Sequence, residues 1–337
     1  MATTTLPKKL VLLAVLSLTG SVYAVLVRYS KVTAKLTYVS STVVAMQELL
    51  KMVVTIFVLL VESGGPTSTI NVLNHHVIRA PLDTSKLAIP SCLYAVQNNM
   101  FFLSLSNMDA PTQQVLLQLK IPFTAMLCVI LLGRSLSMQQ WLSVLLMFFG
   151  TGLIEYYSTT NTMFGHKDKR AVQTGSNENF FLGLFAVVLG SLCSAIAGVY
   201  FEKIIKSNET SLWVRNFQMY IWSVPMSFIG AFMNDSHKIQ ENGFFSGYNR
   251  LVWILIFLSA FSGLLISIVL LYSNNITKCF AASLSIVIST VVSYYLFNYH
   301  IGWYFIVGST LVCCSIFLYV IKCQPSPKKM ETEHSPA

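Results

Sequence analysis

The sequence predicts an all-α polytopic membrane protein. Of its 337 residues, 54% are hydrophobic and only 10% are charged, whereas about 25% of the residues in a soluble domain are charged. The apolar residues gather in segments long enough to cross a bilayer, which takes about 20 residues at 1.5 Å per residue. Lipid offers no hydrogen-bond partners to the backbone, so segments of this length must be helical.

Ten such segments follow one another along the chain. They cover about residues 8–29, 37–61, 85–106, 110–132, 138–157, 180–202, 211–233, 250–273, 278–298 and 301–322. The first is too long for a cleavable signal peptide, and further spans follow it. The polar segment 158–179 joins two sets of five helices, so we expect two halves, residues 1–157 and 180–322, and a tail over residues 323–337. Residues 63–84 are expected to form a loop.

The basic residues indicate how the chain lies in the membrane. An even number of spans places both termini on one side, and the loops on that side hold more Lys and Arg than the loops opposite, which favours cytosolic termini. The net charge of +9 is interpreted as short basic loops facing anionic headgroups, and not as a nucleic-acid surface. The cysteines lack zinc-ligand spacing, so no metal site and no cofactor are expected.

The two halves end in the same way. Leu132-Gly-Arg-Ser-Leu-Ser137 precedes the last helix of the first half, and Phe297-Asn-Tyr-His-Ile-Gly302 precedes the last helix of the second. The same shift along the chain pairs Lys120 with Ser285. Because each half has an odd number of helices, the second copy must be inverted in the membrane. Inverted five-helix repeats are typical of secondary transporters, which bind substrate near the midplane between the halves.

Polar side chains inside the predicted spans mark the candidate site. Such groups are costly in lipid, so they usually line a cavity or pair with each other. The candidates come from five spans, drawn from both halves: Tyr94, Gln97, Asn98, Gln113, Lys120, Thr124, Asn216, Tyr220, Ser267, Lys278 and Ser285. In the fourth span, Gln113, Lys120 and Thr124 would share one stripe of a continuous helix.

Three of the polar positions have competing interpretations. Lys51 follows Glu48 by one helical turn, so the two are interpreted as a self-neutralising pair, with substrate binding as the alternative. Lys120 has no acidic partner within its own helix, and a buried unpaired ammonium tends to lose its proton. An anionic ligand would supply the counter-charge that keeps the Lys120 ammonium protonated. Asn98 has two open interpretations, contact with a substrate or a hydrogen bond to a neighbouring helix.

These residue types suit a nucleotide ligand, because lysines hold phosphate, amides read a base edge and aromatic rings stack on a base. The chain has no Gly-rich phosphate loop ending in Lys-Ser/Thr, so ATP hydrolysis is not indicated. A membrane-embedded transferase needs carboxylates for a metal or a base, and only Glu48 lies well inside a predicted span. We therefore expect a transporter and not an enzyme, with a non-transporting scaffold of the same fold as the alternative.

The same segments closely resemble the nucleotide-sugar transporters, in the pyrimidine branch that carries CMP-sialic acid, UDP-galactose and UDP-N-acetylglucosamine. The likeness runs from about Leu10 to Lys322. Its strongest pieces are Tyr94-Ala-Val-Gln-Asn-Asn99, Gln118-Leu-Lys-Ile121, Ala197-Gly-Val-Tyr-Phe-Glu-Lys203, Ser211-Leu-Trp-Val-Arg-Asn216 and Gly243-Phe-Phe-Ser-Gly-Tyr248.

The resemblance implies a ten-helix drug/metabolite-transporter fold in Golgi or endoplasmic reticulum membranes, surrounded by membrane lipid, with a homo-oligomer left open. It implies exchange of a cytosolic nucleotide sugar for a lumenal nucleoside monophosphate, UMP or CMP. Gln97 and Asn98 would then contact the pyrimidine, and Lys120 and Lys278 the phosphate. The nucleotide pocket would be completed by Asn216, Tyr220 and Ser267.

The chain departs from the family in two segments. The family usually has Tyr-Gln-x-x-Tyr-Gln-Leu-Lys in the fourth helix, where this chain has Gln113-Gln-Val-Leu-Leu-Gln-Leu-Lys120. Both tyrosines are absent, including the one expected against the base. The usual Lys-Tyr-x-Asp-Asn-Ile-x-Lys-Gly is replaced by Leu271-Tyr-Ser-Asn-Asn-Ile-Thr-Lys-Cys279. We favour a UDP-sugar over CMP-sialic acid, because the missing stacking tyrosine weakens the CMP case.

Overall fold

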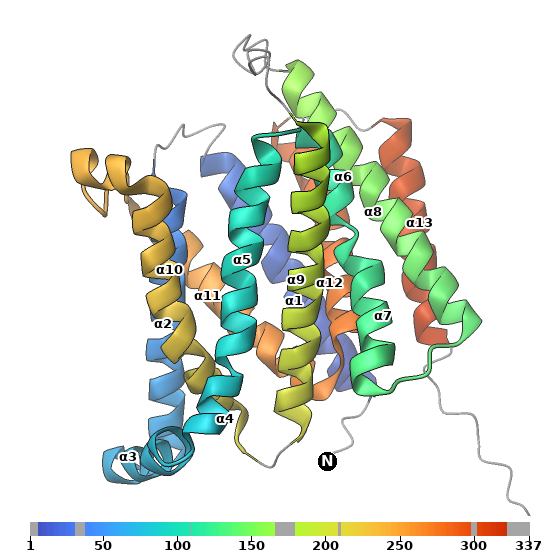
Figure 1. Cartoon of the computed structure of the whole chain (residues 1–337). Coiled ribbons are helices and arrows are strands. Elements are labelled where there is room, and N and C mark those ends of the chain that lie inside the picture. Colours follow the sequence, from blue (N-terminus) through green and yellow to red (C-terminus); the bar gives the residue numbers. More distant parts are fainter. Residues whose placement is uncertain are drawn as a thin grey trace, which may run out of the picture.

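The computed structural model describes residues 6–30, 38–108, 110–165, 179–207, 210–297 and 302–321. Within these ranges every regular element is a helix (Figure 1). The helices are α1 (Leu6–Arg28), α2 (Ser40–Glu62), α3 (Pro66–Leu73), η2 (Asn74–Ile78), α4 (Pro81–Lys86), α5 (Ala88–Leu105), α6 (Ala110–Leu117), α7 (Lys120–Leu132), α8 (Met138–Gly165), α9 (Phe180–Ser207), α10 (Leu212–Asn242), α11 (Arg250–Tyr272), α12 (Asn275–Phe297) and α13 (Trp303–Ile321). Helices therefore cover all ten predicted segments. The tail over residues 323–337 and most of the connecting loop lie outside the described residues.

Six of the helical segments are long and apolar enough to cross a bilayer. They are Leu10–Arg28, Ser40–Glu62, Thr112–Leu132, Phe180–Ser207, Arg250–Tyr272 and Asn275–Leu296, with mean hydropathy between 1.8 and 2.8. This identifies a multi-pass membrane protein. In Figure 1, α1 begins and α13 ends at the lower end of the bundle, which we call the terminal end.

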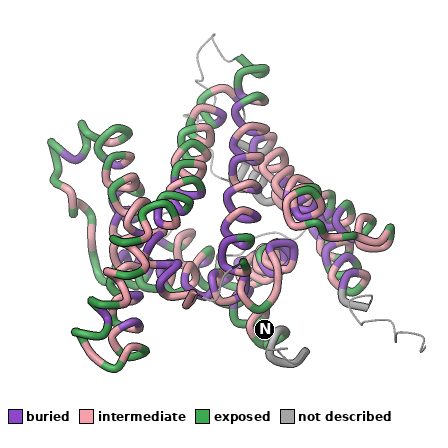
Figure 2. Tube along the Cα trace, turned by 60° about the horizontal axis from the view of Figure 1, so that its bottom comes forward, coloured by how far each residue is buried: buried purple, intermediate pink, exposed green. Residues whose placement is uncertain are grey.

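The helices pack side by side around an interior that α9 and α11 occupy most fully. In the most apolar stretch of each of these two helices 44% of the residues are buried, compared with 17% in α1. The helix pairs with the most extensive contacts are α8 with α13, α5 with α9, α2 with α10, and α1 with α12. Figure 2 shows buried and exposed positions alternating along most helices, because each helix turns one side towards its neighbours.

Two glycines allow α8 and α13 to cross with their backbones in contact. A Cβ atom on Gly308 would lie 2.7 Å from the carbonyl oxygen of Gly150, and a Cβ atom on Gly150 would lie 2.8 Å from the carbonyl oxygen of Gly308. Small residues at a helix crossing are the usual way for membrane helices to approach closely, since lipid provides no hydrophobic driving force between them.

The fourth predicted span, residues 110–132, contains one helical segment of membrane-crossing length, Thr112–Leu132, but its α-helical hydrogen-bond pattern is interrupted. A tighter turn at Gln118 and Leu119 separates α6 from α7, and Leu119 keeps right-handed helical dihedral angles. Pro122 explains the break, because proline has no N–H to bond the carbonyl four residues earlier and its ring crowds that carbonyl. The Gln118 carbonyl accepts instead from the N–H of Ile121, at 2.9 Å.

The segment expected to be a loop, residues 63–84, contains three short helices, α3, η2 and most of α4. Side chains of α10 hold this segment in place. Gln218 donates from Nε2 to the His76 carbonyl at 2.7 Å, and Trp222 donates from Nε1 to the Thr84 carbonyl at 3.0 Å. Helix α10 also continues past the predicted end at residue 233, with a kink at Asp235.

A buried carboxylate joins α7, α9 and the start of α12 at the terminal end. Glu202 is fully buried, and its Oε1 accepts from Arg134 Nη2 at 2.6 Å and from Lys206 Nζ at 2.7 Å. Its Oε2 accepts from the backbone N–H of Asn275 at 2.8 Å. Lys206 also donates to the carbonyl of Ser273. We call these residues the Glu202 network.

Candidate functional site

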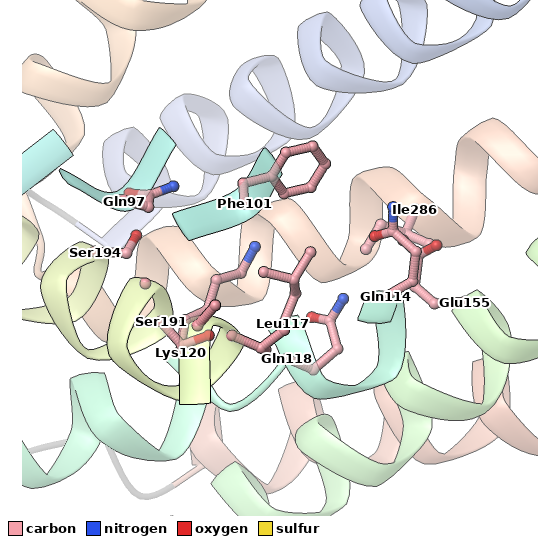
Figure 3. A pocket seen from close by; sticks show the side chains of 13 residues that line it. Gln97, Phe101, Gln114, Leu117, Gln118, Lys120, Glu155, Ser191, Ser194 and Ile286 are labelled. Atoms are coloured by element: carbon pink, nitrogen blue, oxygen red, sulfur yellow. The ribbon is translucent and has the colours of Figure 1, made fainter. Parts of the chain in front are cut away.

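The candidate site is a cavity of about 250 Å³ at the point where the fourth span breaks. It lies between α5, the α6–α7 break, α8, α9 and α12, and so draws on both halves of the chain (Figure 3). Its polar lining residues are Gln97, Gln114, Gln118, Lys120, Glu155, Ser191 and Ser194. We call it the Lys120 cavity.

Lys120 is the first residue of α7, and its side chain is half-buried. In Figure 3 its ammonium group points past the break towards Phe101, inside the cavity. Among the described residues, no carboxylate forms a direct salt bridge with Lys120.

Two further lining residues have polar atoms that are buried without a hydrogen-bond partner. They are Oε1 of Gln97 on α5 and Oγ of Ser191 on α9. Buried polar groups in proteins are nearly always hydrogen-bonded, so such an atom in a cavity indicates a bound water or ligand. The Lys120 cavity therefore offers one cation and at least two unused polar groups to a ligand.

A second cavity, of about 450 Å³, lies between α2, α5 and α10. We call it the α5–α10 cavity. Tyr94, Asn98 and Glu48 line it, together with several apolar side chains. Phe101 lines both cavities, so this residue lies at their boundary. Gln97 and its neighbour Asn98 thus face different cavities, because successive residues of a helix point in different directions.

A polar cluster connects α2, α10 and α11 beside the α5–α10 cavity. Lys51 Nζ lies 2.5 Å from Glu48 Oε1, in agreement with the self-neutralising pair inferred from the sequence, and Ser223 donates to the other carboxylate oxygen at 2.9 Å. The Lys51 ammonium also lies 5.3 Å from the centre of the Tyr220 ring. Tyr220, which is fully buried, hydrogen-bonds to Ser267.

The remaining predicted site residues lie outside the lining of these two cavities. Gln113 is fully buried and donates from Nε2 to the Phe101 carbonyl at 2.9 Å and to Ser104 Oγ at 2.6 Å. Its amide therefore holds α6 against α5. Thr124 donates to the Lys120 carbonyl of its own helix at 2.7 Å.

The second half contributes three of these outlying residues. Asn216 is fully buried, and both atoms of its amide lack a partner among the described residues. Lys278 is half-buried in the first turn of α12, as expected, where Asn274 caps the helix. Ser285 accepts from Ser21 Oγ at 3.4 Å, in the contact between α1 and α12.

Sequence reasoning missed two features of the Lys120 cavity. Glu155 lines it, although this residue lies near the end of the fifth predicted span and was not among the candidates. A second carboxylate besides Glu48 therefore lines a cavity between the helices. Ser191 and Ser194 were also missed, and their spacing of one helical turn on α9 was the signal that could have found them.

The profile of the nucleotide-sugar transporter family matches residues 4–320. The chain belongs to the nucleotide-sugar transporter family. Among its relatives, the UDP-N-acetylglucosamine transporter of Rattus norvegicus is 40% identical over 291 residues, which cover 86% of this chain and 87% of the relative. The UDP-galactose/UDP-N-acetylglucosamine transporter srf-3 of Caenorhabditis elegans is 36% identical, over 92% of this chain and 82% of the relative.

The UDP-galactose translocator of Bos taurus is also 36% identical to this nucleotide-sugar transporter, over 92% of the chain and 77% of the relative. A solved protein crystal structure matches with a TM-score of 0.67 and 11% identity, over 93% of this chain and 98% of that one. That similarity extends to the fold alone. The family resemblance inferred from the sequence is confirmed.

Proposed function

We propose that this nucleotide-sugar transporter is an antiporter that imports a UDP-sugar into the Golgi lumen and returns UMP to the cytosol. The named relatives carry UDP-N-acetylglucosamine and UDP-galactose, which supports a UDP-sugar as cargo. The Lys120 cavity supports the same function from the chain's own chemistry, since an ammonium without a direct ion pair suits the phosphates. The basic loops support cytosolic termini.

The proposal includes ten membrane-crossing helices arranged as two inverted repeats of five. If α1, α2, α5, α6–α7 and α8 correspond to α9, α10, α11, α12 and α13, the contact of α5 with α9 has its counterpart in the contact of α11 with α1. Likewise the contact of α2 with α11 has its counterpart in the contact of α10 with α5. The contact of α1 with α12 has its counterpart in the contact of α9 with α7. The reciprocal approach of Gly150 and Gly308 is also what a two-fold relation between α8 and α13 would produce.

The ligand would occupy the Lys120 cavity with its phosphates at the Lys120 ammonium. A charged group in a membrane interior costs several kcal/mol unless it is paired, and a phosphate in direct contact would supply the ion pair that Lys120 lacks among the described residues. Gln97 would accept a hydrogen bond from the nucleotide through Oε1, and Ser191 would donate or accept one through Oγ, since neither atom has a partner among the described residues. The sugar would extend past Phe101 into the α5–α10 cavity, where Tyr94 and Asn98 are available.

Exchange in proteoliposomes tests this function. Vesicles containing the purified protein are preloaded with UMP, CMP or no nucleotide and are then offered labelled UDP-N-acetylglucosamine, UDP-galactose or CMP-sialic acid. We expect uptake of a UDP-sugar that rises when UMP is inside. Uptake of CMP-sialic acid alone, with CMP inside the vesicles, would overturn the assignment of a UDP-sugar as cargo. Equal uptake by loaded and empty vesicles would overturn the antiport mechanism.

A further inference from the structure

Glu155 places a carboxylate in the same cavity as the Lys120 ammonium. It lies on α8, the last helix of the first half, and lines the cavity together with Gln114 of α6 (Figure 3). Glu155 and Lys120 both line this one cavity, and no direct salt bridge joins them. All other described carboxylates are absent from the lining of this cavity.

The pair therefore differs from the other buried charges of the protein. Lys51 and Glu48 are in direct contact, and Glu202 is held by three donors. These charges are already satisfied by the protein. Lys120 and Glu155 carry opposite charges into one cavity without a direct salt bridge, and the ammonium is turned into the cavity, where a ligand can reach it.

We propose that Glu155 is the counter-ion of Lys120 in the empty transporter and competes with the nucleotide phosphate for it. Without ligand, the carboxylate offsets the ammonium, so that the cavity carries little net charge. When a phosphate arrives, it takes over this role next to a carboxylate that repels it. Glu155 thereby limits the affinity for the nucleotide, and this inference rests on the proposed phosphate site at Lys120.

The Glu155→Gln variant tests the competition, because glutamine has the same shape and no charge. Binding of UMP is measured from the rise in melting temperature of the purified protein with increasing UMP. We expect Glu155→Gln to bind UMP about tenfold more tightly, the order of magnitude for removing one like charge near a bound anion. Glu241→Gln is the control, since it removes the same charge from a side chain that is 58% exposed.

Unchanged binding of UMP by Glu155→Gln would overturn the proposal. Weaker binding would also overturn it, because it would show that the carboxylate contacts the ligand favourably. A second measurement needs no ligand. Lys120→Gln leaves the Glu155 carboxylate without its counter-ion and should lower the melting temperature, and the additional change Glu155→Gln should restore it. Absence of this rescue would also overturn the proposal. If Glu155→Gln restores the melting temperature of Lys120→Gln but the wild-type protein binds neither UMP nor CMP, the counter-ion pair is supported and the phosphate site is rejected.

Discussion

Replacing Glu202 by glutamine is predicted to destabilise the protein strongly. The carboxylate is fully buried and accepts hydrogen bonds from Arg134, Lys206 and the N–H of Asn275. Glutamine keeps one acceptor oxygen but removes the negative charge that offsets both cations. Breaking a buried ion pair by removing one partner costs about 3–5 kcal/mol, and we expect the lower end of this range because Arg134 and Lys206 are partly exposed.

The expected change is measurable as a melting temperature without nucleotide. A loss of about 3 kcal/mol corresponds to a shift of roughly 6 °C, taking about 2 °C per kcal/mol for a large chain. Glu241→Gln again serves as the control for loss of one charge. The Arg134→Gln change should cost clearly less in the Glu202→Gln protein than in the wild type, because the two residues are coupled. A Glu202→Gln shift no larger than that of the control would refute the role assigned to the Glu202 network.

Two other substitutions test the packing. Gly308→Val should lower the melting temperature by separating α8 from α13, since its Cβ would lie 2.7 Å from the Gly150 carbonyl oxygen. Gly230→Val is the control, because a Cβ at that position meets nothing within 4 Å. Equal effects of the two substitutions on the melting temperature would contradict the close crossing. Gln113→Tyr, which would restore the tyrosine common in the family, is expected to destabilise the protein by about 1–3 kcal/mol, because the larger ring has no room and Phe101 and Ser104 lose their donor. Tighter UMP binding by a stable Gln113→Tyr protein would instead support a base contact at this position.

The positions of the helices could be predicted because length and hydropathy are local properties of the sequence. The break at Gln118 is also encoded locally, in Pro122, but a proline within a membrane helix is often tolerated without a break in the span, so its presence alone does not predict one. The three short helices between residues 63 and 87 carry no long apolar pattern. They are held by Gln218 and Trp222 of α10, contacts that only the folded chain reveals.

The candidate site was predicted in part, because polarity inside a span marks a residue but not the direction in which it points. Lys120 and Gln97 line the same cavity, whereas Gln113 packs between helices. Glu155 lies near the end of the fifth predicted span and was not among the candidates, although it lines the same cavity as Lys120. The two residues come from different helices, and the polarity of a single span does not show which residues of another helix share its cavity.

Comparing UMP with uridine tests the central claim, that Lys120 holds the nucleotide phosphate. A ligand present at about a hundred times its Kd stabilises the folded protein by about 2.7 kcal/mol, so its binding is visible in the melting temperature. We predict that UMP stabilises the wild-type protein much more than uridine does, and that this difference disappears in Lys120→Gln. It should persist in the control Lys238→Gln, whose side chain is 67% exposed. An undiminished preference for UMP over uridine in a folded Lys120→Gln protein would contradict the claim.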